Sequence, residues 1–168
     1  ESLNRRFGMD YTAGHIFPTT GAAGALAHAL RAVTKPGDEV LTFAPYFPEY
    51  HPYVEGAGAR LTVVPADIES FQINFAAFEA ALNPEVAVVL INTPNNPVGT
   101  VYTRETLEGL ADVLVQAEQK FDHDIYLISD EPYRELTYGV EVPWVPAIYP
   151  NTLVCYSWSK SLSLPGDR

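Results

Sequence analysis

Polar residues that could carry out chemistry follow four apolar segments of this sequence. Residues 92–99, 129–133 and 157–160 each follow an apolar run, and residues 19–24 follow an expected strand at 15–18 and open a helix. Ligands of open α/β sheets collect at the carboxyl ends of the strands. We therefore expect an asparagine, an aspartate with a tyrosine three residues later, a lysine and a helix start made of small residues to lie at one edge of a sheet.

Each of these features is weak by itself. Asn-Asn-Pro is most often a turn, an aspartate after a strand is often a cap or an ion-pair partner, and a single lysine is usually on the surface. The segment Gly-Ala-Ala-Gly at residues 21–24 can offer backbone amides to an anion. It lacks the glycine and lysine spacing of a P-loop and the three-glycine pattern of a dinucleotide fold. The order in which the four features occur is what indicates a site.

The elements that must position these residues are strands that alternate with helices. Five short apolar runs rich in β-branched residues predict strands, at residues 40–43, 61–64, 86–91, 125–128 and 152–156. The runs are continuous and do not alternate with polar residues, which is typical of parallel strands covered on both faces. Helices are expected at residues 22–33 and 76–82, and in a third segment where Leu107, Leu110 and Leu114 form an apolar stripe with Thr103 as its cap. The sequence predicts an α/β fold, a three-layer α/β/α arrangement with a mostly parallel sheet.

Three motifs in this order resemble those of the class I/II aminotransferases, the fold-type-I enzymes that depend on pyridoxal 5'-phosphate (PLP). They are residues 95–99 (Asn-Asn-Pro-Val-Gly), residues 129–133 (Ser-Asp-Glu-Pro-Tyr) and residues 157–160 (Ser-Trp-Ser-Lys), with Arg168 eight residues after the last motif. The resemblance covers essentially the whole chain. It implies an enzyme that moves an amino group between an amino acid and a 2-oxo acid.

The resemblance also implies a role for each candidate residue. Lys160 would carry PLP as a Schiff base and move the proton, and Asp130 would face the pyridine nitrogen and keep it protonated. Asn96 and Tyr133 would donate hydrogen bonds to the phenolic oxygen. The implied phosphate ligands are the backbone amides of Ala22 and Ala23 together with the side chains of Ser157 and Arg168.

The resemblance implies that an aromatic ring stacks on the pyridine. We assign this role to Phe47, with Tyr46 and Tyr50 as alternatives. The sequence departs from many relatives at Ala23, where a Ser, Thr, Tyr or Gln side chain also contacts the phosphate; Ala23 can give only its amide.

The same resemblance suggests that residues 1–168 are the PLP-binding large domain of a longer chain. The amino-terminal arm and the carboxyl-terminal small domain would lie outside it, and the parent would be a homodimer. We expect the isolated chain to be inactive. A carbon–sulfur lyase or an aminocyclopropane-carboxylate-synthase-like enzyme shares these motifs, and a cofactor-binding domain of a regulator, or an inactive remnant, is the non-enzymatic alternative.

Composition narrows the choice of partners. The chain has 168 residues and a net charge of −11, from 10 basic and 21 acidic residues, which argues against nucleic acid and anionic membranes as partners. One cysteine, Cys155, fits a reducing compartment, and we expect a cytoplasmic protein. The four histidines show no spacing suited to a metal, so no metal site is predicted.

Overall fold

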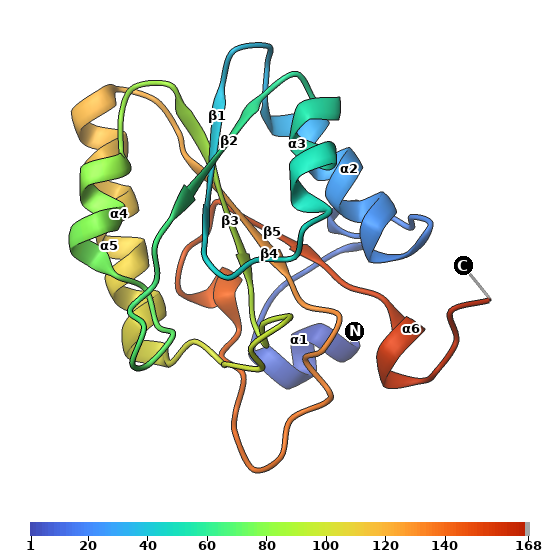
Figure 1. Cartoon of the computed structure of the whole chain (residues 1–168). Helices are drawn as coiled ribbons and strands as arrows, with labels where there is room; N and C mark the ends of the chain where they lie inside the picture. Colours follow the sequence, from blue (N-terminus) through green and yellow to red (C-terminus); the bar gives the residue numbers. More distant parts are fainter. Residues whose placement is uncertain (167–168) are drawn as a thin grey trace.

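The protein folds around one five-stranded parallel sheet, seen in a computed structural model that describes residues 1–166 (Figure 1). The strand order is β2-β1-β3-β4-β5, and each neighbouring pair is parallel. The strands are β1 (Glu39–Phe43), β2 (Arg60–Val64), β3 (Val86–Asn92), β4 (Tyr126–Asp130) and β5 (Thr152–Cys155). All five strands that the apolar runs predict are present, with ends that differ by one or two residues.

Helices cover both faces of this sheet. Helices α4 (Phe75–Ala81) and α5 (Arg104–Phe121) lie together on one side, and α2 (Gly21–Val33) and α3 (Tyr50–Gly56) lie on the other (Figure 1). The remaining elements are α1 (Ser2–Phe7), η1 (Ala13–His15), η2 (Val145–Ala147) and α6 (Trp158–Ser161). This is the three-layer α/β/α arrangement that the sequence predicts.

Alternating side chains of the central strands enter two separate cores. In β3, Val88 and Leu90 pack with the α2 and α3 side, whereas Val89 and Ile91 pack with the α4 and α5 side. All four side chains are fully or almost fully buried. A continuous apolar run is therefore required here, because successive side chains of a strand point to opposite faces.

Two expectations about the strands are wrong. Residues 61–64 are covered only in part: β2 is an edge strand, and Val63 remains 39% exposed. The expected strand at residues 15–18 is not present: His15 ends the short 3₁₀ turn η1, and the extended Ile16 that follows pairs with no strand of the described chain. Ile16 and Phe17 follow it with 52% and 80% exposure. An extended segment needs a neighbouring strand to pair its backbone, and the described residues offer none beside it.

Side-chain hydrogen bonds hold the start of α5 and the amino edge of the sheet. The Thr103 side chain accepts a hydrogen bond from the Thr106 amide at 3.1 Å, so the expected cap is confirmed. At the start of β1, the buried Glu39 accepts hydrogen bonds from Thr62, Arg60 and Asn83. Burial by itself would raise the pKa of Glu39, but these three donors outweigh it and lower the pKa.

Within residues 1–166, no helix is both long and apolar enough to cross a bilayer.

Candidate functional site

The carboxyl ends of β3, β4 and β5 bring the candidate residues together. The parallel register places Asn92 beside Asp130 and Asp130 beside Cys155. Lys160 lies in α6, just after β5, and its Nζ is 5.9 Å from the centre of the Tyr133 ring. Asn96 Nδ2 donates to the Tyr133 hydroxyl at 3.4 Å. One edge of the sheet thus holds an amine, a phenol, an amide and a carboxylate, as the sequence predicts.

Asp130 is a buried carboxyl of this site with a raised pKa. The side chain is 5% exposed, and its pKa is raised to about 7. Burial is the main cause of the rise, and the neighbouring charge of Glu131 adds to it, whereas a hydrogen bond from Tyr50 opposes it. Tyr50 donates to Asp130 Oδ2 at 2.7 Å, whereas Oδ1 is buried and has no hydrogen-bond partner among the described residues. A buried carboxylate oxygen without a partner is suited to a protonated ring nitrogen, which supplies both a hydrogen and a positive charge.

The start of α2 is open to an anion. Gly21 adopts a positive φ of 72°, and the N-cap residue Thr20 makes no side-chain hydrogen bond to the helix. The amides of Ala22 and Ala23 lie in the first turn, where an α-helix leaves its N–H groups without intrahelical acceptors. The first turn contains no acidic residue that would compete with an anion. Helix α2 packs against β4 and β5 on the side of the sheet that also carries α3, from which Tyr50 reaches Asp130.

The other predicted phosphate ligands are less complete. Ser157 is buried and is the N-cap of α6, where its Oγ accepts from the Ser159 amide at 3.3 Å. Ser159 Oγ is itself buried without a hydrogen-bond partner within residues 1–166, a feature that the sequence analysis missed. Arg168 lies outside the described residues.

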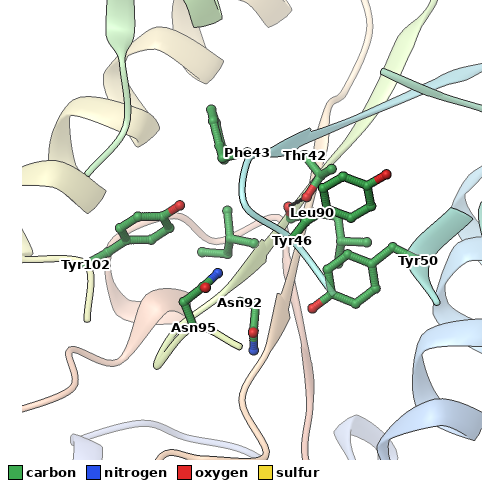
Figure 2. Close-up of a pocket in the computed structure, with 9 residues that line it drawn as sticks. Thr42, Phe43, Tyr46, Tyr50, Leu90, Asn92, Asn95 and Tyr102 are labelled. Atoms are coloured by element: carbon green, nitrogen blue, oxygen red, sulfur yellow. Dashed lines mark hydrogen bonds between the residues drawn. The ribbon is translucent and has the colours of Figure 1, made fainter. Parts of the chain in front are cut away.

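The three aromatic candidates are close to one another at the start of α3. Phe47 packs edge-on against Tyr50, with 5.8 Å between ring centres, and Tyr46 stacks on Tyr50 at 6.4 Å. Figure 2 shows a narrow recess in which the Tyr50 hydroxyl points toward the side where Asn92 lies, while the Tyr46 hydroxyl points away. The recess is lined by Thr42, Phe43, Tyr46, Tyr50, Leu90, Ile91, Asn92, Asn95 and Tyr102. Tyr50 is thus held by Asp130 inside the protein, and Phe47 is half-buried beside it.

A buried ion pair braces the turn that carries Tyr133. Arg134 Nε donates to Glu131 Oε2 at 2.5 Å, and its other nitrogens donate to the carbonyls of Val142 and Pro143. The guanidinium lies beside two aromatic rings, 5.4 Å from the centre of Phe7 and 5.0 Å from that of Trp144. Those two rings stack at 4.3 Å, so α1 is fastened to the same turn.

Two other kinds of site, a metal site and a reactive cysteine, can be checked among the described residues. Within residues 1–166, no three His, Cys, Asp or Glu side chains are grouped so that they could hold a metal ion. Cys155 is 2% exposed, and burial raises the pKa of its thiol, as is typical of a cysteine that packs as a small apolar side chain.

Fold and site together define a class: an α/β domain with a lysine, an aspartate and phenolic-oxygen donors at one sheet edge. Residues 2–168 match the family model described as "Aminotransferase class I and II", and the chain belongs to this PLP-dependent family. The aspartate aminotransferase of Thermotoga maritima is 35% identical over 99% of this chain and 44% of that protein. A probable kynurenine–oxoglutarate transaminase of Saccharomyces cerevisiae is 31% identical over 96% of this chain and 38% of that protein.

Solved structures agree with this assignment. An aminotransferase from Eubacterium rectale superposes with a TM-score of 0.97 at 51% identity, over 99% of this chain and 42% of that one. A variant of Thermus thermophilus aspartate aminotransferase gives a TM-score of 0.89 at 32% identity, over 98% of this chain and 44% of that one. The chain therefore spans less than half the length of the relatives that it matches.

Proposed function

We propose that residues 1–168 are the PLP-binding large domain of an aminotransferase that moves an amino group between an amino acid and a 2-oxo acid. The observation that carries the proposal is the grouping of Lys160, Tyr133 and Asn96 at the sheet edge where Asp130 keeps one buried oxygen without a partner. A structural ion pair does not explain this arrangement, because Asp130 has no cationic partner within residues 1–166.

Each residue has a task that its position supports. The bound cofactor would supply an electrophilic carbon and a ring that accepts electrons. Lys160 Nζ would hold the cofactor covalently, and its free amine would move a proton as a general base. Asp130 would keep a proton on the pyridine nitrogen, and the positive charge of that nitrogen would offset the cost of ionising this buried carboxyl.

The remaining residues hold the cofactor in place. Asn96 and Tyr133 would donate to the phenolic oxygen and stabilise its anionic form. The phosphate would rest on the first-turn amides Ala22 and Ala23, with Ser157 and Arg168 completing the set. Phe47 would stack on the pyridine ring, while Tyr50 is committed to its bond with Asp130.

Several parts of the proposal concern the whole enzyme. Since the matched relatives are more than twice as long, the remaining domains would complete the substrate site, and the enzyme would act as a homodimer in the cytoplasm. The single cysteine is in keeping with a reducing compartment. Relatives are named for aspartate and for kynurenine, so an acidic and an aromatic amino acid, each with 2-oxoglutarate, are the first substrate pairs to test.

The direct test is a visible spectrum of the full-length enzyme with PLP, repeated on Lys160→Ala. We expect an absorbance band that borohydride traps on the wild-type protein and that is missing in the variant. A folded wild-type enzyme without the band, or an unchanged band in Lys160→Ala, would overturn the assignment of Lys160. With an amino acid alone, pyridoxamine phosphate should accumulate, whereas pyruvate release from cystathionine would instead identify a carbon–sulfur lyase.

A further inference from the structure

We infer that Asn92 is a positioning residue that sets the spacing between Asp130 and Asn96 at the cofactor site. The inference rests on the proposed function, because both residues face the cofactor only if PLP binds there. Asn92 is the last residue of β3 and is 4% exposed. Its side chain is therefore enclosed by the protein and does not act on substrate itself.

The Asn92 side chain joins the two residues by two hydrogen bonds. Its Nδ2 donates to the backbone carbonyl of Asp130 at 2.8 Å, and its Oδ1 accepts from the backbone amide of Asn96 at 2.6 Å. The amide of Thr93 also reaches the Asp130 carbonyl, but at 3.4 Å, so Asn92 makes the shorter bond. The orientation of the Asn92 amide is fixed by its partners, since a backbone N–H must face the oxygen and a carbonyl must face the nitrogen.

The position of this link gives it a chemical consequence. Asp130 would bind the pyridine nitrogen, and Asn96, which also contacts Tyr133, would donate to the phenolic oxygen of the same rigid ring. The distance between those two groups must match the ring, and small errors in the placement of donors weaken hydrogen bonds steeply. A planar side chain with one donor and one acceptor holds the end of β4 and the β3–α5 loop at a fixed separation.

Asn95 provides a matched comparison within the same loop. Its Nδ2 donates to the Pro45 carbonyl at 3.3 Å, and its Oδ1 accepts from the Val98 amide at 3.1 Å. It is the same residue type with the same donor and acceptor pattern, but neither partner is a proposed cofactor ligand. Replacing either asparagine should therefore destabilise the loop. Only the replacement of Asn92 should also change the pKa of the bound cofactor.

The test compares Asn92→Leu, Asn95→Leu, Asn96→Leu and the double variant Asn92→Leu/Asn96→Leu in the full-length enzyme with PLP bound. The readout is the pKa of the pH-dependent visible band, with the thermal midpoint of the cofactor-free protein as a record of folding. Loss of a donor to the phenolic oxygen disfavours its anionic form, so Asn92→Leu should raise this pKa by about one unit, a tenfold change in the protonation equilibrium. Asn95→Leu should leave the pKa within about 0.3 unit of wild type.

The double variant decides whether Asn92 acts through Asn96. If it does, the shift caused by Asn92→Leu disappears when Asn96 is already leucine, and the double variant matches Asn96→Leu. Three results would overturn the inference. They are a wild-type pKa in Asn92→Leu, an equal pKa shift in Asn95→Leu, and a double variant in which the shifts of Asn92→Leu and Asn96→Leu add. If Asn92→Leu does not fold, the smaller Asn92→Ser takes its place with the same criteria. A wild-type enzyme that forms no visible band overturns the proposed function, whereas a normal band with an unshifted Asn92 variant overturns the positioning role alone.

Discussion

Replacing Tyr50 with phenylalanine removes one hydrogen bond from Asp130 and leaves an aromatic ring in the same recess. The Tyr50 hydroxyl donates to Asp130 Oδ2 at 2.7 Å, and both side chains are buried. Burial raises the pKa of Asp130 to about 7, and the bond from Tyr50 holds it below the value that burial alone would give. Tyr50→Phe should therefore raise the pKa of Asp130 further.

The sign of the pH dependence follows from the direction of this shift. In the cofactor-free protein, Asp130 binds a proton more tightly when folded than when unfolded, where its pKa is near the ordinary 3.8. The stability associated with that proton is fully present below about pH 4 and is lost as the pH rises through about 7. A difference of roughly 3 pKa units corresponds to about 4 kcal/mol of unfolding free energy.

The effect of Tyr50→Phe should grow across the same pH range. Below about pH 7 the lost bond goes to a neutral carboxyl and is worth about 1 kcal/mol, whereas above it the bond goes to a carboxylate and is worth about 2–3 kcal/mol. The destabilisation by Tyr50→Phe should thus increase by about 1–2 kcal/mol as Asp130 ionises, which equals a rise of about one pKa unit.

Urea unfolding of the cofactor-free full-length enzyme, from about pH 5 to about pH 9, measures this increase. The same comparison in an Asp130→Asn background is the control, because no carboxyl remains to ionise there. A Tyr50→Phe destabilisation that is constant across the pH range would refute the assignment of Asp130 as the titrating group. An increase that persists in the Asp130→Asn background would refute it as well.

Two further predictions concern other buried charges. Glu39 has a lowered pKa, so the stability it contributes is present above about pH 4.5 and is lost as the pH falls through its folded pKa. Glu39→Gln should cost about 1–2 kcal/mol near neutral pH and clearly less in acid, as measured by urea unfolding at both pH values; an equal cost in acid would contradict this. Arg134→Met should cost about 3–5 kcal/mol because it leaves Glu131 buried and unpaired, whereas Glu131→Gln/Arg134→Met should recover part of that loss. If the double variant is less stable than Arg134→Met in thermal unfolding, the unpaired charge of Glu131 is not the cause of the loss.

Much of the fold follows from local patterns in the sequence. The apolar runs predicted all five strands because a parallel strand covered on both faces, such as β3, needs apolar side chains at consecutive positions. Thr103 predicted the start of α5 because a cap bonds to amides within its own first turn. Lys160 and Asp130 were predicted to lie at one edge of the sheet because the carboxyl ends of parallel strands share that edge.

The failures occur where pairing between distant segments decides the outcome. Residues 15–18 look like a strand locally, but the described residues give this segment no strand to pair with. The run at residues 61–64 cannot by itself report that β2 lies at the edge of the sheet, where Val63 stays partly exposed.

The sequence by itself determined which residue types follow the carboxyl ends of the strands, because the apolar runs that mark those ends are local. Only the tertiary structure decided that Tyr50 bonds to Asp130, 80 residues away, and that Asn92 joins Asp130 to Asn96. The physical reason is that a hydrogen bond depends on the register of the strands and on the packing of helices over them. Neither is encoded within the few residues on which a sequence pattern rests.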